Sequence, residues 1–596
     1  MANREETPNT LRVILSGGWM VSLVFLPNLN DPFNAPKSWA LSIFGFWLFG
    51  WALFQIKGNL SAPTLKWFTI LAGFYLFTLI VGFVATDNKY IAMFGEYQRR
   101  TGFLSYFSLI IFLITASYIF RINNIHSLEK SIVAISFVMG SYGFAQHFKH
   151  DFVHWANPYN SVISTVGNPD FAGALMGIFL IINFGVLIQT KYKTWVRIFS
   201  GLNSFLLFVV IIFSQVRQGL LAAGLGISIV AIVWVHQRHK FIAYALSSLV
   251  IVVGSLSLFG MLNKGILAKY FYKMSITYRG DYWRAGWQMF IHHPLFGVGL
   301  DRYGANFRTY RDSTQSLRRG PDLVSTAAHN VPIQLLATGG IFVFLAYFAL
   351  TVFILWRGVV ALKRLQGAQQ IIAASIFSAW IAYEAQSFVS IDNLGLAIWG
   401  YILGGALVGL SCIATKSNMK PSILQPIFSG SLTLIIFVIA ILFYGAESSM
   451  HALRSQPSPK TQAEVFSYKV ALKKPLGYTF KEPSFRVIAA GDLAFVSDFE
   501  GASDQLKNVI AADPLNYDAK VLLAKIYEYQ KKWPLAVQVR KTIYAIDPYN
   551  QMNLLTLGED EKSIGDLGQS KNILNLINSF APNSDEARQA LQDFGR

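Results

Sequence analysis

The sequence has a single cysteine, few charged side chains, and fewer acidic than basic ones. Cys412 has no partner for a disulfide within the chain, and no Cys/His cluster has the spacing of a metal site. Only 14% of the 596 residues are charged whereas 53% are hydrophobic, a composition typical of membrane proteins. These shortages exclude a disulfide-stapled secreted domain and a chain that is soluble throughout.

The excess of Lys and Arg gives a formal net charge of +18. Such a charge indicates nucleic-acid binding only where the positive residues form one face of a soluble domain. Most of them lie instead at the ends of long apolar runs, so we expect no nucleic-acid partner. The apolar runs end near Gly445, and the remainder of the chain has the composition of a soluble domain.

Runs of roughly 17–25 apolar residues are long enough to cross a bilayer as helices. The first run is not followed by a small-residue cleavage site, so we expect a retained span rather than a signal peptide. The sequence predicts an all-α, polytopic membrane domain over residues 1–445 with thirteen spans. They lie near 11–28, 39–56, 65–85, 103–120, 128–148, 171–189, 196–213, 219–235, 241–260, 333–356, 369–390, 394–412 and 425–445.

The distribution of Lys and Arg among the short connections predicts the orientation of the bundle. With the N-terminus inside the cell, every inner connection is basic, as Arg238 and Lys240 illustrate. The outer short connections carry fewer positive charges, except for the segment 89–100. An odd number of spans then places both the long polar loop at about 261–332 and the C-terminal domain outside the cytoplasm.

The C-terminal part of the chain repeats itself, because Pro514, Pro548 and Pro582 are spaced 34 residues apart. This period indicates helix–turn–helix repeats of the tetratricopeptide type over residues 481–596. The middle copy carries the signature residues Leu523, Ala524, Tyr527, Trp533, Ala536 and Pro548. We expect residues 446–480, with SQPSPK and KKPLG, to form a turn-rich or extended linker. Such repeats imply a docking surface for a protein partner, and a structural spacer is the alternative.

The long polar loop carries ten Lys and Arg residues, counted from Lys264, against four Asp residues. A basic loop between spans indicates a site for an anionic head group, because the planar fork of Arg binds phosphate with two hydrogen bonds. The loop ends at Ala328-His329-Asn330, at the mouth of the next span. His329 is a candidate base because its ordinary pKa lies near neutrality. A histidine that only begins a helix is the alternative.

Two further polar segments lie on the predicted outer side. Arg217, in SQVRQG, joins two spans with almost no loop and is therefore held near the membrane boundary. There it either engages an anionic ligand or anchors a lipid phosphate. In the segment GNPDFAG, the Asn-Pro pair is a turn signal, and we expect Asp170 to cap the following helix rather than to act in catalysis.

Other polar and aromatic residues leave two interpretations open. Glu384 lies inside a predicted span and is a functional candidate for that reason. It either pairs with an arginine of the outer face or faces the interior of the bundle. Tyr282, Trp283 and Trp287 form either an interfacial aromatic belt, which the pattern favours, or a platform on which a glycan stacks.

Three segments, in this order, resemble the superfamily of O-antigen ligases and O-antigen polymerases. They are SQVRQG, YRGDYWRAGWQMFIHHPLFGVGLDRY and AHNVPIQLLATGG, and GNPDFAG fits the same pattern. The resemblance implies a metal-independent, inverting glycosyltransferase of the GT-C type in a bacterial cytoplasmic membrane. Its donor would be a glycan on undecaprenyl pyrophosphate, and its acceptor a glycan, a lipid or a protein. No cofactor is expected.

The resemblance also implies roles for individual residues. Arg217 and Arg279 match the arginines thought to engage the pyrophosphate, and His329 matches the histidine thought to activate the acceptor hydroxyl. Arg302, which follows HPLFGVGL, is expected to support the donor site, and Glu384 is a possible supporting residue. A pyrophosphate leaving group needs its developing charge neutralised, and no acidic cluster offers metal ligands, so the arginines must serve.

A polytopic transporter and a membrane-anchored repeat scaffold without catalytic activity are the alternatives. Transporters often show internal repeats with broken spans at matching positions. No such symmetry is visible in this sequence, and thirteen spans exceed what an anchor requires.

Overall fold

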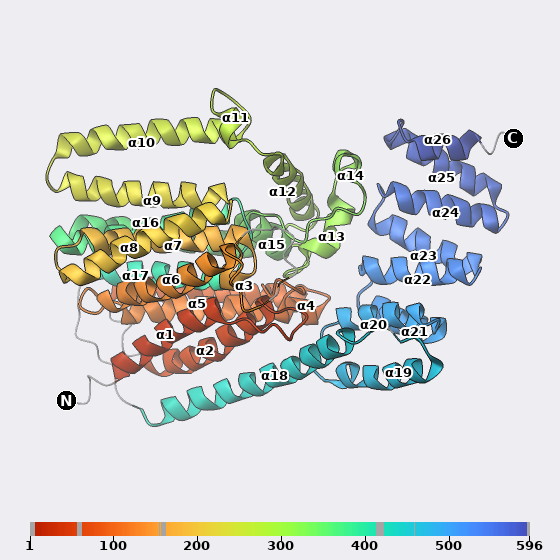
Figure 1. The fold of residues 1–596 in the computed structure, drawn as a ribbon, viewed down its shortest axis with the longest axis horizontal. Coiled ribbons are helices and arrows are strands. Elements are labelled where there is room, and N and C mark those ends of the chain that lie inside the picture. Colours follow the sequence, from red (N-terminus) through yellow and green to blue (C-terminus); the bar gives the residue numbers. More distant parts are fainter. Residues whose placement is uncertain are drawn as a thin grey trace.

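The fold was analysed in a computed structural model, which describes residues 6–56, 62–153, 155, 162–412, 422–457 and 459–592. Within these ranges the chain forms helices and turns and contains no strand. The extreme ends of the two predicted domains, 1–5 and 593–596, lie outside the described residues. A helical bundle and a second helical body make up the molecule (Figure 1).

Thirteen longer helices form the bundle, one for each apolar run of the sequence. They are α1 (Glu6–Leu23), α2 (Asn34–Gln55), α3 (Pro63–Ala85), α5 (Phe103–Ile119), α6 (His126–His147), α7 (Pro169–Ile188), α8 (Thr194–Phe213), α9 (Arg217–His236), α10 (Lys240–Met261), α15 (Val331–Arg364), α16 (Gly367–Ser387), α17 (Leu394–Ser411) and α18 (Leu424–Arg454). The all-α prediction is confirmed.

Of the described helices, nine are long and apolar enough to cross a membrane by themselves. They are α2, α3, α7, α8, α9, α10, α15, α17 and α18. The other four are shorter or more polar: α5 has 17 residues, α1 carries Glu6 and Arg12, and α6 and α16 carry Glu129 and Glu384. The chain is a multi-pass membrane protein, and the count of thirteen spans stays a prediction.

The centre of the bundle is helix α17, all of whose residues are buried. Glycines let its neighbours approach closely, because a Cβ at Gly405 would collide with the Leu113 carbonyl of α5. Where α7 and α9 cross, a Cβ at Gly219 would likewise collide with the Gly173 carbonyl. Small residues at such contacts are the usual means of packing helices in a membrane.

Helix α15 is broken near its start, at Gly340, which has φ +74°. The turn that follows α12 (Met274–His292) fills the break. The Pro294 carbonyl accepts a hydrogen bond of 2.9 Å from the Ile341 amide, and the Val298 amide donates one of 2.9 Å to the Ala337 carbonyl. The HPLFGVG segment therefore fixes the short first part of α15, directly after His329.

The long polar loop is folded into helices at one end of the bundle. Besides α12 it contains α11 (Ala268–Phe271), α13 (Tyr303–Tyr310) and α14 (Ser313–Arg319). Two short elements, α4 (Lys89–Phe94) and η3 (Ser164–Val166), complete the bundle. Asp281 of α12 accepts hydrogen bonds from Arg284, at 2.6 Å, and from Arg318 of α14, at 2.9 Å, which ties these loop helices together.

The C-terminal part is a stack of antiparallel helix pairs, hereafter the solenoid, which runs from α19 at the bottom to α26 at the top of Figure 1. Its helices are α19 (Gln462–Gly477), α20 (Ser484–Phe495), α21 (Phe499–Ala512), α22 (Tyr517–Tyr529), α23 (Trp533–Ile546), α24 (Gln551–Ser563), α25 (Leu567–Phe580) and α26 (Asp585–Gln592). Helices α21, α23 and α25 begin 34 residues apart, which confirms the predicted repeat. Asn516 and Asn550 cap the first helices of two pairs.

The predicted linker at 446–480 is largely helical, so the expectation of a turn-rich or extended segment is wrong for most of it. Helix α18 continues to Arg454, and KKPLG lies within α19, with Pro475 inside the helix. The reason is packing: Ala446, Met450 and Leu472 are buried in one apolar cluster with residues of α20 to α22. Tertiary burial thus outweighs the local turn signal.

The solenoid lies against the end of the bundle that carries α12 to α14 (Figure 1). Glu482, just before α20, accepts hydrogen bonds from Arg100 and, at 3.0 Å, from Tyr90. Arg100 also pairs with Glu447 of α18, at 3.2 Å. The loop and the solenoid therefore share one end of the bundle, as the odd number of predicted spans requires. Which side of the membrane that end faces stays a prediction.

Candidate functional site

His329 lies in the turn that leads into α15, with a backbone φ of +51°. A positive φ is uncommon outside glycine and is found preferentially at functional positions. The neighbouring residues hold this conformation. The Ala328 amide donates to the Gln334 side chain at 2.9 Å, and Asn330 caps α15 by accepting from the Ile333 amide at 2.9 Å. Asn330 also donates to the Phe388 carbonyl at 2.9 Å. The imidazole is therefore presented by a rigid turn.

The ring of His329 is half-buried and packs against Tyr282 of α12, with ring centroids 5.4 Å apart. Burial, followed by the positive charges of Arg279, Arg99 and Arg319, lowers the pKa of His329 from 6.5 to about 4. Burial is the larger cause, and the like charges of the arginines add to it. The imidazole is consequently neutral at physiological pH, as a general base must be.

The arginines of the loop divide into two groups by their partners. Five of the seven form ion pairs with carboxylates: Arg284, Arg302, Arg308, Arg311 and Arg318. Within the described loop, Arg279 and Arg319 have no carboxylate within ion-pair distance. Arg319 donates to the hydroxyl of Tyr282 and lies over the ring of Tyr278, 4.1 Å from its centroid. Both of these arginines act on His329, so two guanidinium groups without a carboxylate partner lie close enough to influence the imidazole.

Arg217 begins α9 and is exposed, and its guanidinium donates to the Tyr270 carbonyl of α11. Its neighbour Gln218 donates to the backbone carbonyl of Asp170, at 3.3 Å, so the N-termini of α7 and α9 lie side by side. The Asp170 charge in turn acts on the guanidinium of Arg279, opposing the lowering of the Arg279 pKa by burial. Asp170 thereby connects the surroundings of Arg217 with those of Arg279 and, through Arg279, with His329.

Asp170 does not cap α7, contrary to expectation. Asn168 is the capping residue, because its side chain accepts a hydrogen bond of 2.8 Å from the Asp170 amide. Asp170 instead lies in the first turn of the helix, where a negative charge is favourable. The Asn-Pro turn is as expected, with the cap two residues earlier.

Arg302 is not brought together with Arg217 and Arg279. It is 5% exposed, and its two terminal nitrogens bind both carboxylate oxygens of Asp513 in the solenoid, at 2.8 and 2.7 Å. A guanidinium held in this way by a carboxylate has no free fork for a pyrophosphate. The structure thus places Arg302 in a contact between loop and solenoid.

A second such contact lies one repeat further along the solenoid. Asp547, which is fully buried, accepts from Arg308 at 2.8 Å and from Arg311 at 2.8 Å. Asp513 and Asp547 occupy the same position of successive repeats, directly before the turn prolines. We call Arg302, Arg308 and Arg311 with these two aspartates the arginine–aspartate clamp. The clamp holds α13 and its flanking turns against the solenoid.

Glu384 faces the interior of the bundle rather than an arginine. Tyr347 donates to its carboxylate at 3.2 Å, and the two residues line a small cavity that is also lined by Tyr383. Tyr383 donates in turn to Asp392, at 3.1 Å. No ion pair of Glu384 occurs among the described residues, so of the two open interpretations the structure favours the second.

Sequence reasoning missed two residues beside His329. Arg319 was one of several loop arginines with nothing to distinguish it, since only its lack of a carboxylate partner sets it apart. Tyr282, expected in an aromatic belt, is buried against His329 and accepts from Arg319. Nothing in the sequence around Tyr282 shows that its ring contacts His329, which lies on a different segment of the loop.

The fold and this site define a multi-pass helical membrane protein with a C-terminal helical repeat domain. Comparison with protein families is consistent with that class and more specific. Residues 202–348 match the family described as O-antigen ligase. This range contains Arg217, Arg279 and His329, and it ends within α15. The chain thus carries an O-antigen ligase domain, which indicates a glycosyltransferase-like enzyme with ligase-like or polymerase-like function.

The other comparisons add little. Comparison with curated proteins gives no match. Similar solved structures include the crystal structure of the APC/C hetero-tetramer Cut9-Hcn1, with 10% identity over 94% of this chain and 90% of that chain. The TM-score is 0.20, too low to support any conclusion about fold or function.

Proposed function

We propose that this protein transfers a glycan from undecaprenyl pyrophosphate to an acceptor hydroxyl at the outer face of a bacterial cytoplasmic membrane. The observation that carries the proposal is the convergence at His329. The two loop arginines that lack a carboxylate partner both act on a histidine that is neutral at physiological pH. An anion site beside an available base is what glycosyl transfer from a pyrophosphate requires.

In this proposal the donor pyrophosphate is bound by Arg279 and Arg319, and Arg217, whose neighbour Gln218 contacts Asp170, supports the same site. When the bond between the anomeric carbon and the pyrophosphate oxygen breaks, negative charge develops on that oxygen. Cationic donors already in place stabilise this charge without reorganisation. The N-termini of α7 and α9 lie side by side at the same place, and helix N-termini favour anions. We propose that arginines supply the positive charge and that the reaction is metal-independent.

His329 acts as the general base in this proposal. A ring nitrogen takes the proton of the acceptor hydroxyl while the hydroxyl oxygen attacks the anomeric carbon from the side opposite the pyrophosphate. A single displacement of this kind inverts the anomeric configuration. Among the described residues no hydrogen-bond partner occupies the ring nitrogens of His329, so they are available to a substrate hydroxyl. Tyr282 and the fixed turn at Ala328 orient the ring.

The acceptor distinguishes the possible members of the family: a lipid for a ligase, a growing glycan for a polymerase, and a protein for a protein glycosyltransferase. All three present a hydroxyl from outside the membrane, and His329 lies where the loop enters the bundle. We also propose that the solenoid binds a protein partner. The clamp engages the turns between its repeats, which leaves its other faces for a further contact.

One reconstitution tests the proposal. Purified protein in lipid nanodiscs is incubated with an undecaprenyl-pyrophosphate glycan and, separately, with a lipid, a glycan and a protein acceptor, while release of glycan from the prenyl lipid is followed. We expect acceptor-dependent transfer that Arg279→Ala and Arg319→Ala abolish or greatly reduce. Wild-type turnover in both alanine variants would contradict the donor site, and transfer to none of the acceptors would contradict the proposed reaction.

A further inference from the structure

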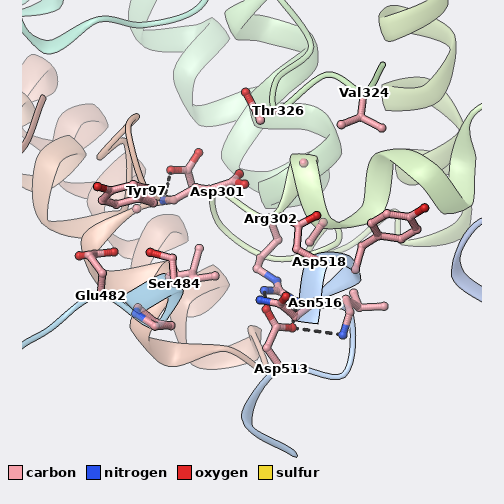
Figure 2. A pocket seen from close by; sticks show the side chains of 18 of the residues that line it. Tyr97, Asp301, Arg302, Val324, Thr326, Glu482, Ser484, Asp513, Asn516 and Asp518 are labelled. Carbon is pink, nitrogen blue, oxygen red and sulfur yellow. Dashed lines mark hydrogen bonds and ion pairs between the residues drawn. The ribbon is translucent and has the colours of Figure 1, made fainter. Parts of the chain in front are cut away.

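A cavity of about 320 Å³ lies between the bundle, the loop and the solenoid. Glu96 and Tyr97, between α4 and α5, form one wall, and Gly304 of α13 and Thr326 form another. Ser484 and Tyr517 of the solenoid close the third side. Figure 2 shows Tyr97, Glu482 and Ser484 across the cavity from Arg302, Asp513 and Asp518. Its volume is at the lower end of the roughly 300–1,000 Å³ typical of small-molecule sites.

The two arginines that line this cavity are already paired with carboxylates. Arg302 is bound by Asp513 and Arg308 by Asp547, at 2.7 and 2.8 Å. Asp301, another lining residue, is paired with Arg99 at 3.1 Å. The lining also carries more carboxylates than arginines, so an anionic ligand is disfavoured here, which separates this cavity from the arginines beside His329.

Two polar atoms of the lining are buried without a partner. They are Oε2 of Glu96 and the hydroxyl of Ser484, for which the described residues offer no hydrogen bond. Leaving such atoms without a hydrogen bond destabilises the folded protein. The space in front of the carboxylate is kept open by Gly304, because a Cβ there would lie 2.9 Å from Oε2 of Glu96. Both orphaned atoms therefore point to a ligand that offers hydrogen bonds.

The ionisation of Glu96 fits the same class of ligand. Burial raises the pKa of Glu96 to about 7, with Arg99 opposing this rise. Near neutral pH the carboxyl group can therefore accept or donate a hydrogen bond, as a hydroxyl-rich ligand requires. The lining also offers the rings of Tyr97 and Tyr517, which present apolar surface next to polar groups.

We propose that this cavity is a binding site for an uncharged sugar unit of a glycan substrate. This inference rests on the proposed function where it assigns the sugar to a glycan substrate. The preference for an uncharged, hydroxyl-rich ligand is argued from the lining of the cavity alone. The cavity is connected to His329 through Thr326, three residues away in sequence, and through Arg99, which donates to the Thr326 carbonyl and also acts on His329. A sugar in the cavity belongs either to the acceptor, next to the hydroxyl that reacts, or to the donor glycan.

Binding is measured first, without transfer. Saturation-transfer NMR on the full-length protein in nanodiscs uses neutral trisaccharides of glucose, galactose, mannose and N-acetylglucosamine, with trigalacturonate as the anionic comparison. We expect at least one neutral trisaccharide to bind and trigalacturonate to bind more weakly. Glu96→Ala and Ser484→Leu should each weaken binding about tenfold, the effect of one or two lost hydrogen bonds. Asp504→Asn, an exposed change on α21, is the matched control.

Ser484→Leu replaces an unsatisfied hydroxyl by an apolar group, so it tests the site without depending on Glu96. The inference is wrong if no neutral trisaccharide binds the wild type, or if both variants bind like the control. The KM values of transfer then identify the source: a rise for the acceptor alone assigns the sugar to the acceptor, and a rise for the donor alone assigns it to the donor. Sugar binding that the variants lose, in a protein that transfers to no acceptor, would support the cavity and contradict the proposed function.

Discussion

The clamp makes a strong prediction about stability, tested by the substitution Asp547→Asn. Asp547 is fully buried and forms ion pairs with both Arg308 and Arg311, while the amide of Asn keeps the size of the side chain and loses its charge. Removing one partner of a buried ion pair costs about 3–5 kcal/mol, because the remaining charge is left uncompensated. Here two guanidinium groups are left. We therefore expect the solenoid to separate from the loop rather than each repeat to unfold.

Hydrogen–deuterium exchange of the purified protein measures this separation. Amides of α13 and of the turn between α23 and α24 should exchange faster in Asp547→Asn, whereas the helices α20 and α21 should keep their protection. The control is Asp585→Asn, whose carboxylate pairs with Arg588 but is 92% exposed, so it should leave exchange unchanged. Unchanged exchange at α13 in Asp547→Asn would refute the reasoning, since the clamp would then not hold the loop.

Three further predictions concern the site and the topology. Because the pKa of His329 is lowered to about 4 in the free protein, the neutral base is lost only as the pH falls through that value, and kcat/KM should decline near pH 4. A bound pyrophosphate raises the pKa of His329, so kcat, which reports the donor-bound enzyme, should decline at a higher pH. A decline that remains in His329→Gln would show that another group titrates. Arg279→Lys keeps the charge but loses the bidentate fork, and should lower donor kcat/KM about 10–100-fold, whereas Arg284→Lys on the same helix should not; equal effects would remove Arg279 from the donor site. A cysteine at the exposed position Lys507, with the buried Cys412 replaced by Ala, should react with impermeant maleimide in intact cells after any outer membrane is permeabilised; protection until lysis would reverse the topology.

Regular periodicity made much of the fold predictable. Each apolar run forms a helix because a backbone in lipid must satisfy its own hydrogen bonds. The 34-residue spacing of the turn prolines fixed where the repeats begin, since the same turn recurs between helix pairs. The prediction of a turn at KKPLG is wrong because burial of Leu472 against the helices that follow α19 outweighs the local signal of Pro475.

The partners of the arginines could not be predicted. Arg279 and Arg302 lie in one motif and look equivalent in sequence, yet the second is bound by Asp513, 211 residues further along the chain. The two aspartates of the clamp are visible before the turn prolines, but nothing in the sequence shows that they face the loop. The donor site is thus defined by which arginines remain unpaired, and that depends on how the solenoid docks.

His329 itself was predictable by its place at the end of the basic loop, but its electrostatic environment was not. Burial, at a position packed against Tyr282, lowers its pKa more than the like charges of the nearby arginines do. This burial also has a consequence for folding. In the unfolded chain the pKa of the imidazole returns to its ordinary 6.5, so the unfolded state binds more protons as the pH falls from 6.5 towards 4, and stability declines over that window.

The central claim is that His329 deprotonates the acceptor while arginines hold the donor. It is tested most directly by measuring donor binding and glycan transfer in parallel for His329→Gln, in nanodiscs that contain the undecaprenyl-pyrophosphate glycan. We predict that transfer falls by about 10²–10⁴-fold, the usual contribution of a general base, while donor affinity stays at the wild-type value. Transfer at the wild-type rate would contradict the assignment of the base, and loss of donor binding together with transfer would show that His329 holds the donor instead.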